Sequence, residues 1–187
     1  MIKKLVILLI LYCIASSLPA QKIKYNKSFL KKLEQVQIDL YTPVEGKYKS
    51  LRPSRNDYQP IDHIIFSKQE DLEIRYAIIP FNEKDKSTQV PNIDFMRVVT
   101  SCATNRQEDA VISMHGLDED DLIEHFNADW GNIAYFQPKV RFSNRKHCRL
   151  LGLYKEGRGM VYVFFLFDEA DRMLDNRLQA LRFNTKI

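Results

Sequence analysis

The most constraining feature of this sequence is a run of eight residues, Met160 to Phe167, that is apolar at every position. A strand with only one buried face alternates apolar and polar side chains, so a strand without alternation is typical of a sheet covered on both faces. A second apolar run, 150–154, precedes it, and the segment 156–159 between the two contains two glycines. The pattern predicts a central antiparallel hairpin with packing layers on both sides.

Further apolar runs predict the rest of the sheet. Some alternate with polar residues and some are separated by polar turns, as in antiparallel sheets. Pro138 lies inside the last of them and cannot donate to a ladder, so that strand is expected at a sheet edge. The expected strands are 36–40, 61–66, 72–81, 111–114 and 133–142.

Three segments have helical periodicity. The first begins at Pro91, where a missing N–H costs nothing, and is expected to end at Asn105. A short second helix follows the N-cap residue Asp118, and a third runs from the N-cap residue Asp168 to Leu181. Helices following strands in this order predict an α+β fold.

The length and composition fit one domain. The chain has 187 residues, of which 45% are hydrophobic and 28% charged, which excludes collagen and a charge-driven disordered chain. We expect a single layered sandwich over 36–187, with a mostly antiparallel sheet packed by helices. Residues 21–35 are expected to form a loose lead-in with one short turn capped by Ser28.

One known fold has this order of elements. An opening strand ends in Thr42-Pro43, a hairpin and the helix after Pro91 follow, and a closing hairpin leads into a helix ending Leu178-Gln179-Ala180-Leu181-Arg182-Phe183. Over about residues 36–184 this outline resembles the PsbP-like α/β/α sandwich, shared by an extrinsic photosystem II subunit and a Ran-binding nuclear-import factor. The resemblance implies a binding protein rather than a catalyst, and it transfers no functional residue because the fold has no common catalytic set.

The first twenty residues have the three parts of a secretory signal peptide. Lys3 and Lys4 are followed by an apolar run from Leu5 to Ile14 and by small residues up to Ala20. We expect cleavage after Ala20 and a secreted or periplasmic protein. An uncleaved anchor is the alternative, and Cys13 lacks the small preceding residues that lipidation needs.

Removal of the leader lowers the formal net charge from +4 to +2. Nucleic-acid-binding domains usually have a strong basic excess, so no nucleic-acid partner is expected. No transmembrane segment is expected after the leader, and no cofactor motif is recognised.

Two cysteines, Cys102 and Cys148, remain in the predicted mature chain. In an oxidising compartment they could form one disulfide, which the chain-entropy model values at about 4 kcal/mol. The alternative is two buried free thiols in the core.

Two imidazoles and several carboxylates lie close together in the sequence. His115, Asp121 and His125 form a weak candidate metal site, with Asp121 and His125 one helical turn apart. The alternative is that the acidic residues cap a helix and interact favourably with its dipole.

No hydrolase motif is present. The chain lacks a Gly-x-Ser-x-Gly elbow, and His147 and Cys148 are neighbours that point to opposite faces of a strand. An envelope hydrolase using scattered Asp, Glu and His residues stays open, because carboxylate pairs are defined only in space.

Basic residues are concentrated in the segments 43–60 and 141–149. Arg141, Arg145, Lys146 and Arg149 are candidate ligand-binding residues, together with Trp130 if it is a ligand platform rather than a core residue. If both segments met, they would form an anion-binding patch with tyrosines at its edge. The sequence therefore predicts an exported, non-catalytic binding or accessory domain of the cell envelope, whose partner is a protein or an anionic ligand.

Overall fold

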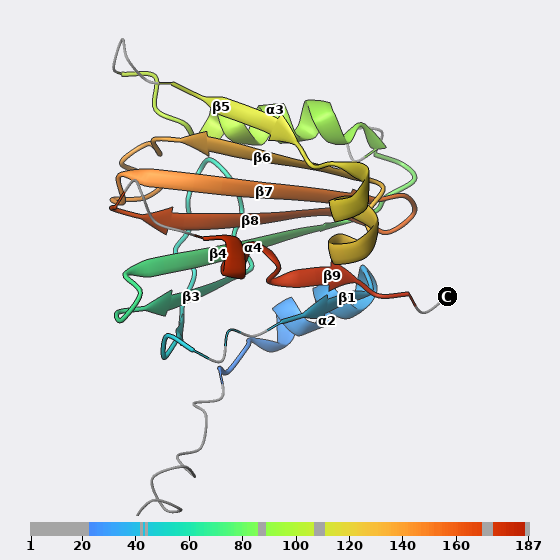
Figure 1. Ribbon diagram of the computed structural model, residues 1–187, viewed down its shortest axis with the longest axis horizontal. Helices are drawn as coiled ribbons and strands as arrows, with labels where there is room; N and C mark the ends of the chain where they lie inside the picture. The colour runs from blue at the N-terminus through green and yellow to red at the C-terminus, as the bar shows by residue number, and fades with distance from the viewer. Residues whose placement is uncertain are drawn as a thin grey trace, which may run out of the picture.

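The computed structural model describes residues 23–41, 43, 45–85, 89–106, 111–169 and 174–185. The predicted leader, its cleavage bond and Cys13 lie outside these residues. Within them, the main sheet has seven antiparallel strands in the order β2-β3-β4-β8-β7-β6-β5 (Figure 1). These strands are β2 (Lys49–Leu51), β3 (His63–Ser67), β4 (Leu72–Pro80), β5 (Ser113–Gly116), β6 (Trp130–Phe136), β7 (His147–Lys155) and β8 (Gly159–Phe167). The expected α+β fold with a mostly antiparallel sheet is confirmed.

The predicted central hairpin is the middle of this sheet. β7 and β8 pair from His147↔Phe167 to Lys155↔Gly159, and all nine residues of β8 are buried. β4 pairs with the other side of β8, so β8 is covered by strands at both edges and by side chains on both faces. This burial on both faces explains why apolar and polar residues do not alternate in the sequence of β8.

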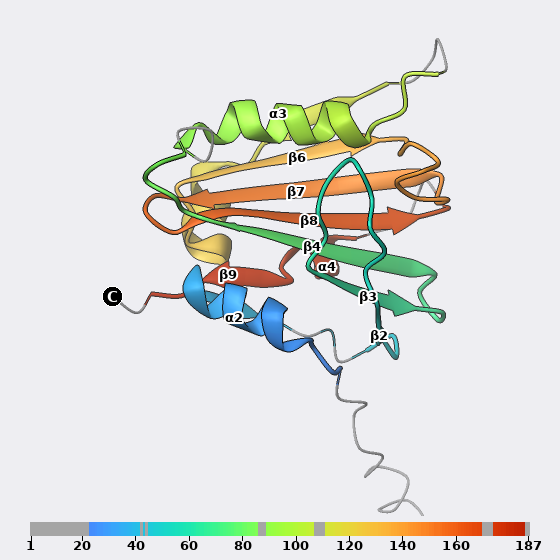
Figure 2. The ribbon, with the colours of Figure 1, turned by 180° about the vertical axis from the view of Figure 1, so that it is seen from behind.

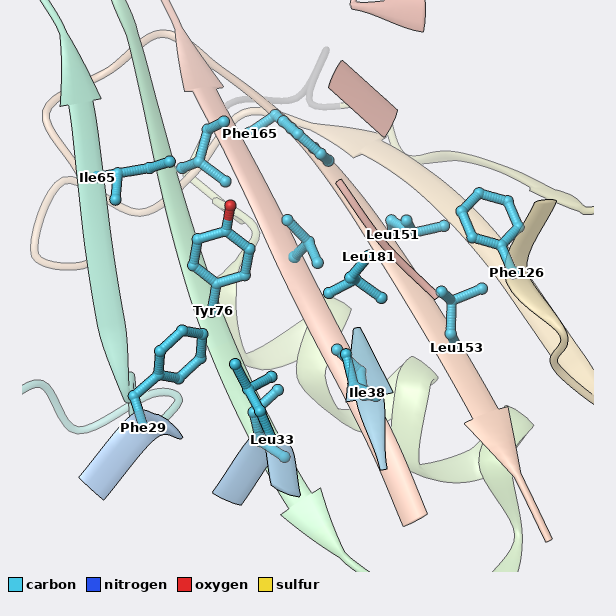
Figure 3. Close-up of a cluster of buried hydrophobic side chains, with 14 of the residues drawn as sticks. Phe29, Leu33, Ile38, Ile65, Tyr76, Phe126, Leu151, Leu153, Phe165 and Leu181 are labelled. Carbon is cyan, nitrogen blue, oxygen red and sulfur yellow. The ribbon is translucent and has the colours of Figure 1, made fainter. Parts of the chain in front are cut away.

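One face of the sheet carries the larger core. Figure 3 shows part of it, with Phe165 of β8 and Tyr76 of β4 among side chains from the covering layer. Four elements supply that layer: α2 (Lys27–Gln35), η2 (Asp121–Phe126, a π-helix), and the two-stranded sheet of β1 (Ile38–Leu40) with β9 (Leu181–Phe183). A short helix, α4 (Asp175–Leu178), precedes β9.

The opposite face carries a second core under helix α3 (Pro91–Cys102). Figure 2 shows α3 and the long β2–β3 loop crossing this face. Pro91 is at the start of α3 as expected, and Phe95 is 1% exposed, with its ring 5.6 Å from that of Trp130. Trp130 is half-buried and packs against the second core, and it does not line the basic pocket described below. The helix ends at Cys102 with Ala103 as its C-cap, two residues before the expected end at Asn105.

The expected loose lead-in is wrong for residues 27–35, which form α2. Asn26 rather than Ser28 is the N-cap, and its Oδ1 accepts from the Phe29 N–H at 2.7 Å. Phe29 and Leu33 are buried against the sheet. These two residues lie one helical turn apart, so they form an apolar side. Burial of that side explains why a helix forms in a short polar segment.

The expected helix from Asp168 to Leu181 is also wrong. Among the described residues of this segment, only Asp175–Leu178 are helical. Leu181 and Phe183 alternate on β9, where they pair with Leu40 and Ile38. Tertiary pairing with β1 thus overrides the helical spacing. Residues 170–173 of the expected helix lie outside the described residues.

β6 is an interior strand and not the predicted edge. It ends at Phe136, before Pro138, so the proline ends the strand instead of lying in its ladder. The edge position is taken by β5, which begins two residues later than expected and pairs with β6 from Ser113↔Tyr135 to Gly116↔Asn132. β2 lies within the basic segment 43–60, for which the sequence predicted no strand.

His63 connects the segment before α2 to the sheet. Its ring stacks on Phe29 with centroids 5.0 Å apart, its Nδ1 lies 3.1 Å from the Asn26 side-chain nitrogen, and its Nε2 lies 3.2 Å from Ser50 Oγ. Because Asn26 Nδ2 can only donate, Nδ1 accepts, and Nε2 carries the proton of a neutral imidazole. Burial lowers the pKa of His63 below its ordinary value.

We expect the protein to lose stability in mild acid through His63. The unfolded chain takes up this proton near the ordinary pKa of 6.5, whereas the folded chain takes it up only at lower pH. The free energy of unfolding therefore falls as the pH drops below about 6.5, until the folded pKa is passed. Urea unfolding of wild type and His63→Gln from pH 7.5 to 5 measures this; His115→Gln, on an exposed residue, is the control. Equal pH slopes in all three proteins would contradict it.

Candidate basic pocket at the end of α3

A pocket of about 480 Å³ lies where three segments meet. The β2–β3 loop supplies one wall, the residues after α3 a second, and the turn after β6 the third. Its lining residues are Tyr58, Thr104, Asn105, Arg106, Lys139, Val140 and Arg141. Three of them are cations and none is a carboxylate, so the pocket has a positive potential.

The end of α3 and the turn after β6 are joined through their backbones. Thr104 N–H donates to Gln137 O at 2.8 Å, and Lys139 N–H donates to Cys102 O at 2.8 Å. Lys139 Nζ donates to the carbonyls of Ser101 at 2.6 Å and Thr100 at 3.2 Å. The ammonium group thus satisfies carbonyls at the helix C-terminus, where a cation is favourable, and it is fixed in the pocket wall.

Tyr58 is positioned by its own loop. Asn56 Oδ1 accepts from the backbone N–H groups of Tyr58 at 3.0 Å and Gln59 at 2.9 Å, which makes an Asx-type turn. Ser101 Oγ on α3 donates to Tyr58 O at 3.2 Å. Lys139 Nζ lies 5.3 Å from the centre of the Tyr58 ring, within cation–π distance. The aromatic wall is therefore held against the fixed cation.

Arg106 and Arg141 complete the pocket and are both exposed. Among the residues that the structure describes, neither guanidinium has an ion-pair partner. Two exposed guanidinium groups beside one fixed ammonium form an arrangement that suits an anion, because guanidinium groups bind phosphate and carboxylate with two parallel hydrogen bonds.

Of the candidate ligand-binding residues, only Arg141 lines this pocket. Arg145 pairs instead with Asp71 and Asp168, each at 2.7 Å, and its guanidinium lies over the Phe66 ring. Lys146 donates its backbone N–H to Asp168 at 2.9 Å. Burial acts in the opposite direction, but the bonds from Lys146 and Arg145 hold the pKa of Asp168 below its ordinary value.

The anion-binding patch that the sequence predicted from the segments 43–60 and 141–149 is therefore not formed as one surface. Arg149 lies within β7, where its register partners are Tyr135 and Phe165, away from the pocket lining. The segments 43–60 and 141–149 meet in the pocket only through Tyr58 and Arg141. Sequence reasoning missed Lys139 and Arg106; Lys139 precedes Arg141 by two residues and could have been included, whereas no local signal marks Arg106.

The weak metal site is not assembled. Asp121 and His125 lie 3.6 Å apart, but among the described residues no three His, Cys, Asp or Glu side chains are close enough to hold a metal ion. Asp118 Oδ1 accepts from Asp121 N–H at 2.8 Å, which is the capping role of the alternative interpretation. His115 lies on β5, apart from the pair.

Cys102 and Cys148 are buried free thiols, so the disulfide left open by the sequence is not formed in this structure. Cys102 ends α3 and Cys148 lies on β7, both in the second core. Burial raises the pKa of Cys102 to about 12 and also raises that of Cys148. A thiolate at either position is therefore disfavoured.

His147 and Cys148 do not form a pair, because they lie on opposite faces of β7. The His147 ring stacks on that of Tyr135, whose hydroxyl is 2.5 Å from Nδ1.

A second pocket, of about 720 Å³ between α2 and β1, has Glu34 and Asp39 in its lining. Both carboxylates are exposed, whereas a carboxylic acid catalyst is normally kept protonated by burial.

Every helix in the described part of the chain is too short or too polar to cross a membrane.

No protein-family profile matches the chain, and a comparison with curated protein sequences finds no match. Among solved structures, the chain is similar to the solution structure of cyanobacterial PsbP (CyanoP) from Synechocystis sp. PCC 6803, with 13% sequence identity and a TM-score of 0.40, over 80% of this chain and 94% of that chain. This is the fold that the order of elements resembles, and we take no residue role from it.

Proposed function

We propose that this protein is an exported, non-catalytic binding domain of the cell envelope, and that its basic pocket takes an anionic group of a ligand or partner protein. The observation that carries the proposal is the convergence of Arg106, Lys139 and Arg141 on one pocket without a carboxylate in its lining. Isolated surface cations are usually solvated, whereas cations from separate segments around one aromatic wall form a recognition site.

The composition of the pocket favours binding over catalysis. Its titratable side chains are two arginines, one lysine and one tyrosine. Arginine stays protonated at any ordinary pH, so it can hold an anion but cannot act as a general base. The Lys139 ammonium group donates hydrogen bonds to two backbone carbonyls, so it is held in the pocket wall as part of the structure.

The export part of the proposal rests on the sequence of the first twenty residues. Expression of the full chain with its own leader, in a bacterium with an intact secretory pathway, tests it. Mass spectrometry of the protein from the envelope fraction is expected to give an N-terminus at Gln21. Recovery of the chain only in the cytosol with Met1 intact would overturn the compartment and leave the pocket proposal standing.

The pocket is tested with inorganic phosphate as the probe. We expect saturable binding with a Kd of about 1 mM, a free energy of about −4 kcal/mol. Each guanidinium contributes a charge-assisted bond of about 1.5 kcal/mol, so Arg106→Gln and Arg141→Gln are each expected to weaken binding about tenfold. NMR titration of the backbone N–H groups of Asn105 and Val140 gives both the site and the affinity.

Arg55→Gln is the matched control, because Arg55 is exposed on the same loop as Tyr58 but does not line the pocket. Its Kd should equal that of wild type within about twofold, because an exposed charge that does not contact the anion is largely screened at 0.15 M salt. Shifts of equal size in all three variants, or none up to 20 mM phosphate (roughly twentyfold above the expected Kd), would contradict the proposal.

A further inference from the structure

The two edges of the main sheet differ in how well they are protected. The β2 edge carries Lys49 and is flanked by Lys47, Arg52 and Pro53. Charges and prolines of this kind prevent a further strand from pairing. The sequence from Val111 to Leu117, which contains β5, has no Asp, Glu, Lys, Arg or Pro.

β5 has a free side. All four of its residues are exposed, and among the described residues it pairs with β6 alone. Alternate residues of an edge strand point their backbone N–H and C=O groups away from the sheet, where they can pair with another chain. This edge therefore offers unpaired backbone groups without the charges that protect β2.

An apolar surface adjoins this edge on the α3 side of the sheet. Met114 stands opposite Ala134, a residue of the second core, so its side chain lies on that face, and Ile112 follows by alternation. Ile112 and Met114 are 41% and 40% exposed, and Met96 on α3 is 46% exposed. Figures 1 and 2 show α3 and β5 at the same end of the sheet. Methionine side chains adapt readily to different partners.

The charges nearby restrict the partner. Asp118, Glu119 and Asp120 follow β5 and are exposed. An antiparallel strand added to β5 would place its own N-terminal end beside these carboxylates. A second copy of β5 would bring Val111 and Ile112 to this end, and these residues have no positive charge to pair with the carboxylates.

We propose that β5 is a strand-addition site for an extended segment of another polypeptide, in which two basic residues precede alternating apolar residues. The segment pairs antiparallel with β5, its apolar side chains cover Ile112 and Met114, and its basic residues meet Asp118 to Asp120. This surface is separate from the basic pocket, and the proposal does not depend on the pocket.

The probe is the synthetic peptide KKVTVTV with a fluorophore at its carboxyl end, titrated with the purified protein and followed by fluorescence anisotropy. We expect a Kd of about 100 µM, typical of a short strand pairing, and about tenfold weaker binding to Met114→Lys. Hydrogen exchange of the backbone N–H groups in 113–116 should slow when the peptide is bound. Leu51→Lys is the matched control, because Leu51 is 42% exposed on the opposite edge; its Kd should be unchanged.

Two further peptides test the chemistry of the partner. EEVTVTV should bind about tenfold more weakly because its charges are reversed, and KKVTPTV should not bind because proline removes a ladder N–H. Failure of KKVTVTV to bind at 1 mM, equal binding to Met114→Lys, or equal binding of EEVTVTV would overturn the proposal. A concentration-dependent dimer that Met114→Lys abolishes, without peptide binding, would overturn it in favour of pairing between two copies.

Discussion

Replacing Gly152 with valine is expected to lower the free energy of unfolding by about 3 kcal/mol, at the upper end for overpacking of a core. A Cβ at this position would lie 2.4 Å from Cδ2 and 2.7 Å from Cε2 of Phe95, which is the buried anchor of α3. The Phe95 ring lies between those of Trp130 and Tyr162 at 5.6 and 6.4 Å, so it cannot turn aside. Valine at this position must therefore push α3 away from the sheet. Urea unfolding followed by circular dichroism measures the loss.

Gly116→Val is the matched control, because among the described residues beyond its chain neighbours no atom lies within 4 Å of a Cβ built at Gly116. Its stability should stay within about 0.5 kcal/mol of wild type, as for most exposed substitutions. Since α3 leads directly into Thr104–Arg106, phosphate binding should also weaken in Gly152→Val and stay normal in Gly116→Val. Equal stability of the two variants would contradict the packing described for α3.

Phe165→Ala should be the most destabilising single truncation on the other face, at about 4 kcal/mol. Phe165 is fully buried on β8 and lies in the middle of the larger core, between side chains of the sheet and those of the covering layer (Figure 3). Removing the ring leaves a cavity that neighbouring strands, paired on both sides, cannot close. Thermal and urea unfolding of the variant measure the effect.

Tyr76→Phe in the same core gives the opposite expectation. The Tyr76 hydroxyl is fully buried, and among the described residues it has no hydrogen-bond partner. Burial of an unpaired hydroxyl is unfavourable, so its removal should leave stability unchanged or raise it by about 1 kcal/mol. Loss of stability in Tyr76→Phe would mean that the hydroxyl does have a partner in solution.

The parts of the fold that the sequence predicted correctly are those with strong local periodicity. Three features were predicted from neighbouring residues alone: the uninterrupted apolar run of β8, the hairpin of β3 and β4, and the proline at the start of α3. The errors occur where a distant segment decides the outcome. Leu181 and Phe183 have spacing compatible with either a helix or a strand, and only pairing with β1, more than a hundred residues earlier, selects the strand.

The candidate site was predictable to a smaller extent, for the same reason. Arg141 could be named because it belongs to a local cluster of cations. That cluster is divided in the structure because Asp71, far away in the sequence, and Asp168 pair with Arg145. Arg106 joins the pocket only because α3 ends beside the turn after β6, a contact made by the backbones of Thr104 and Gln137.

The pairing of β1 with β9 has a consequence for biosynthesis. One strand comes from the first part of the described chain and the other from the last, and together they cover the larger core. A ribosome releases the C-terminal residues last, so a nascent chain has no means of sealing this core during translation. The larger core therefore stays open until β9 has been synthesised, and resistance to proteases on this face of the sheet should appear only after that point.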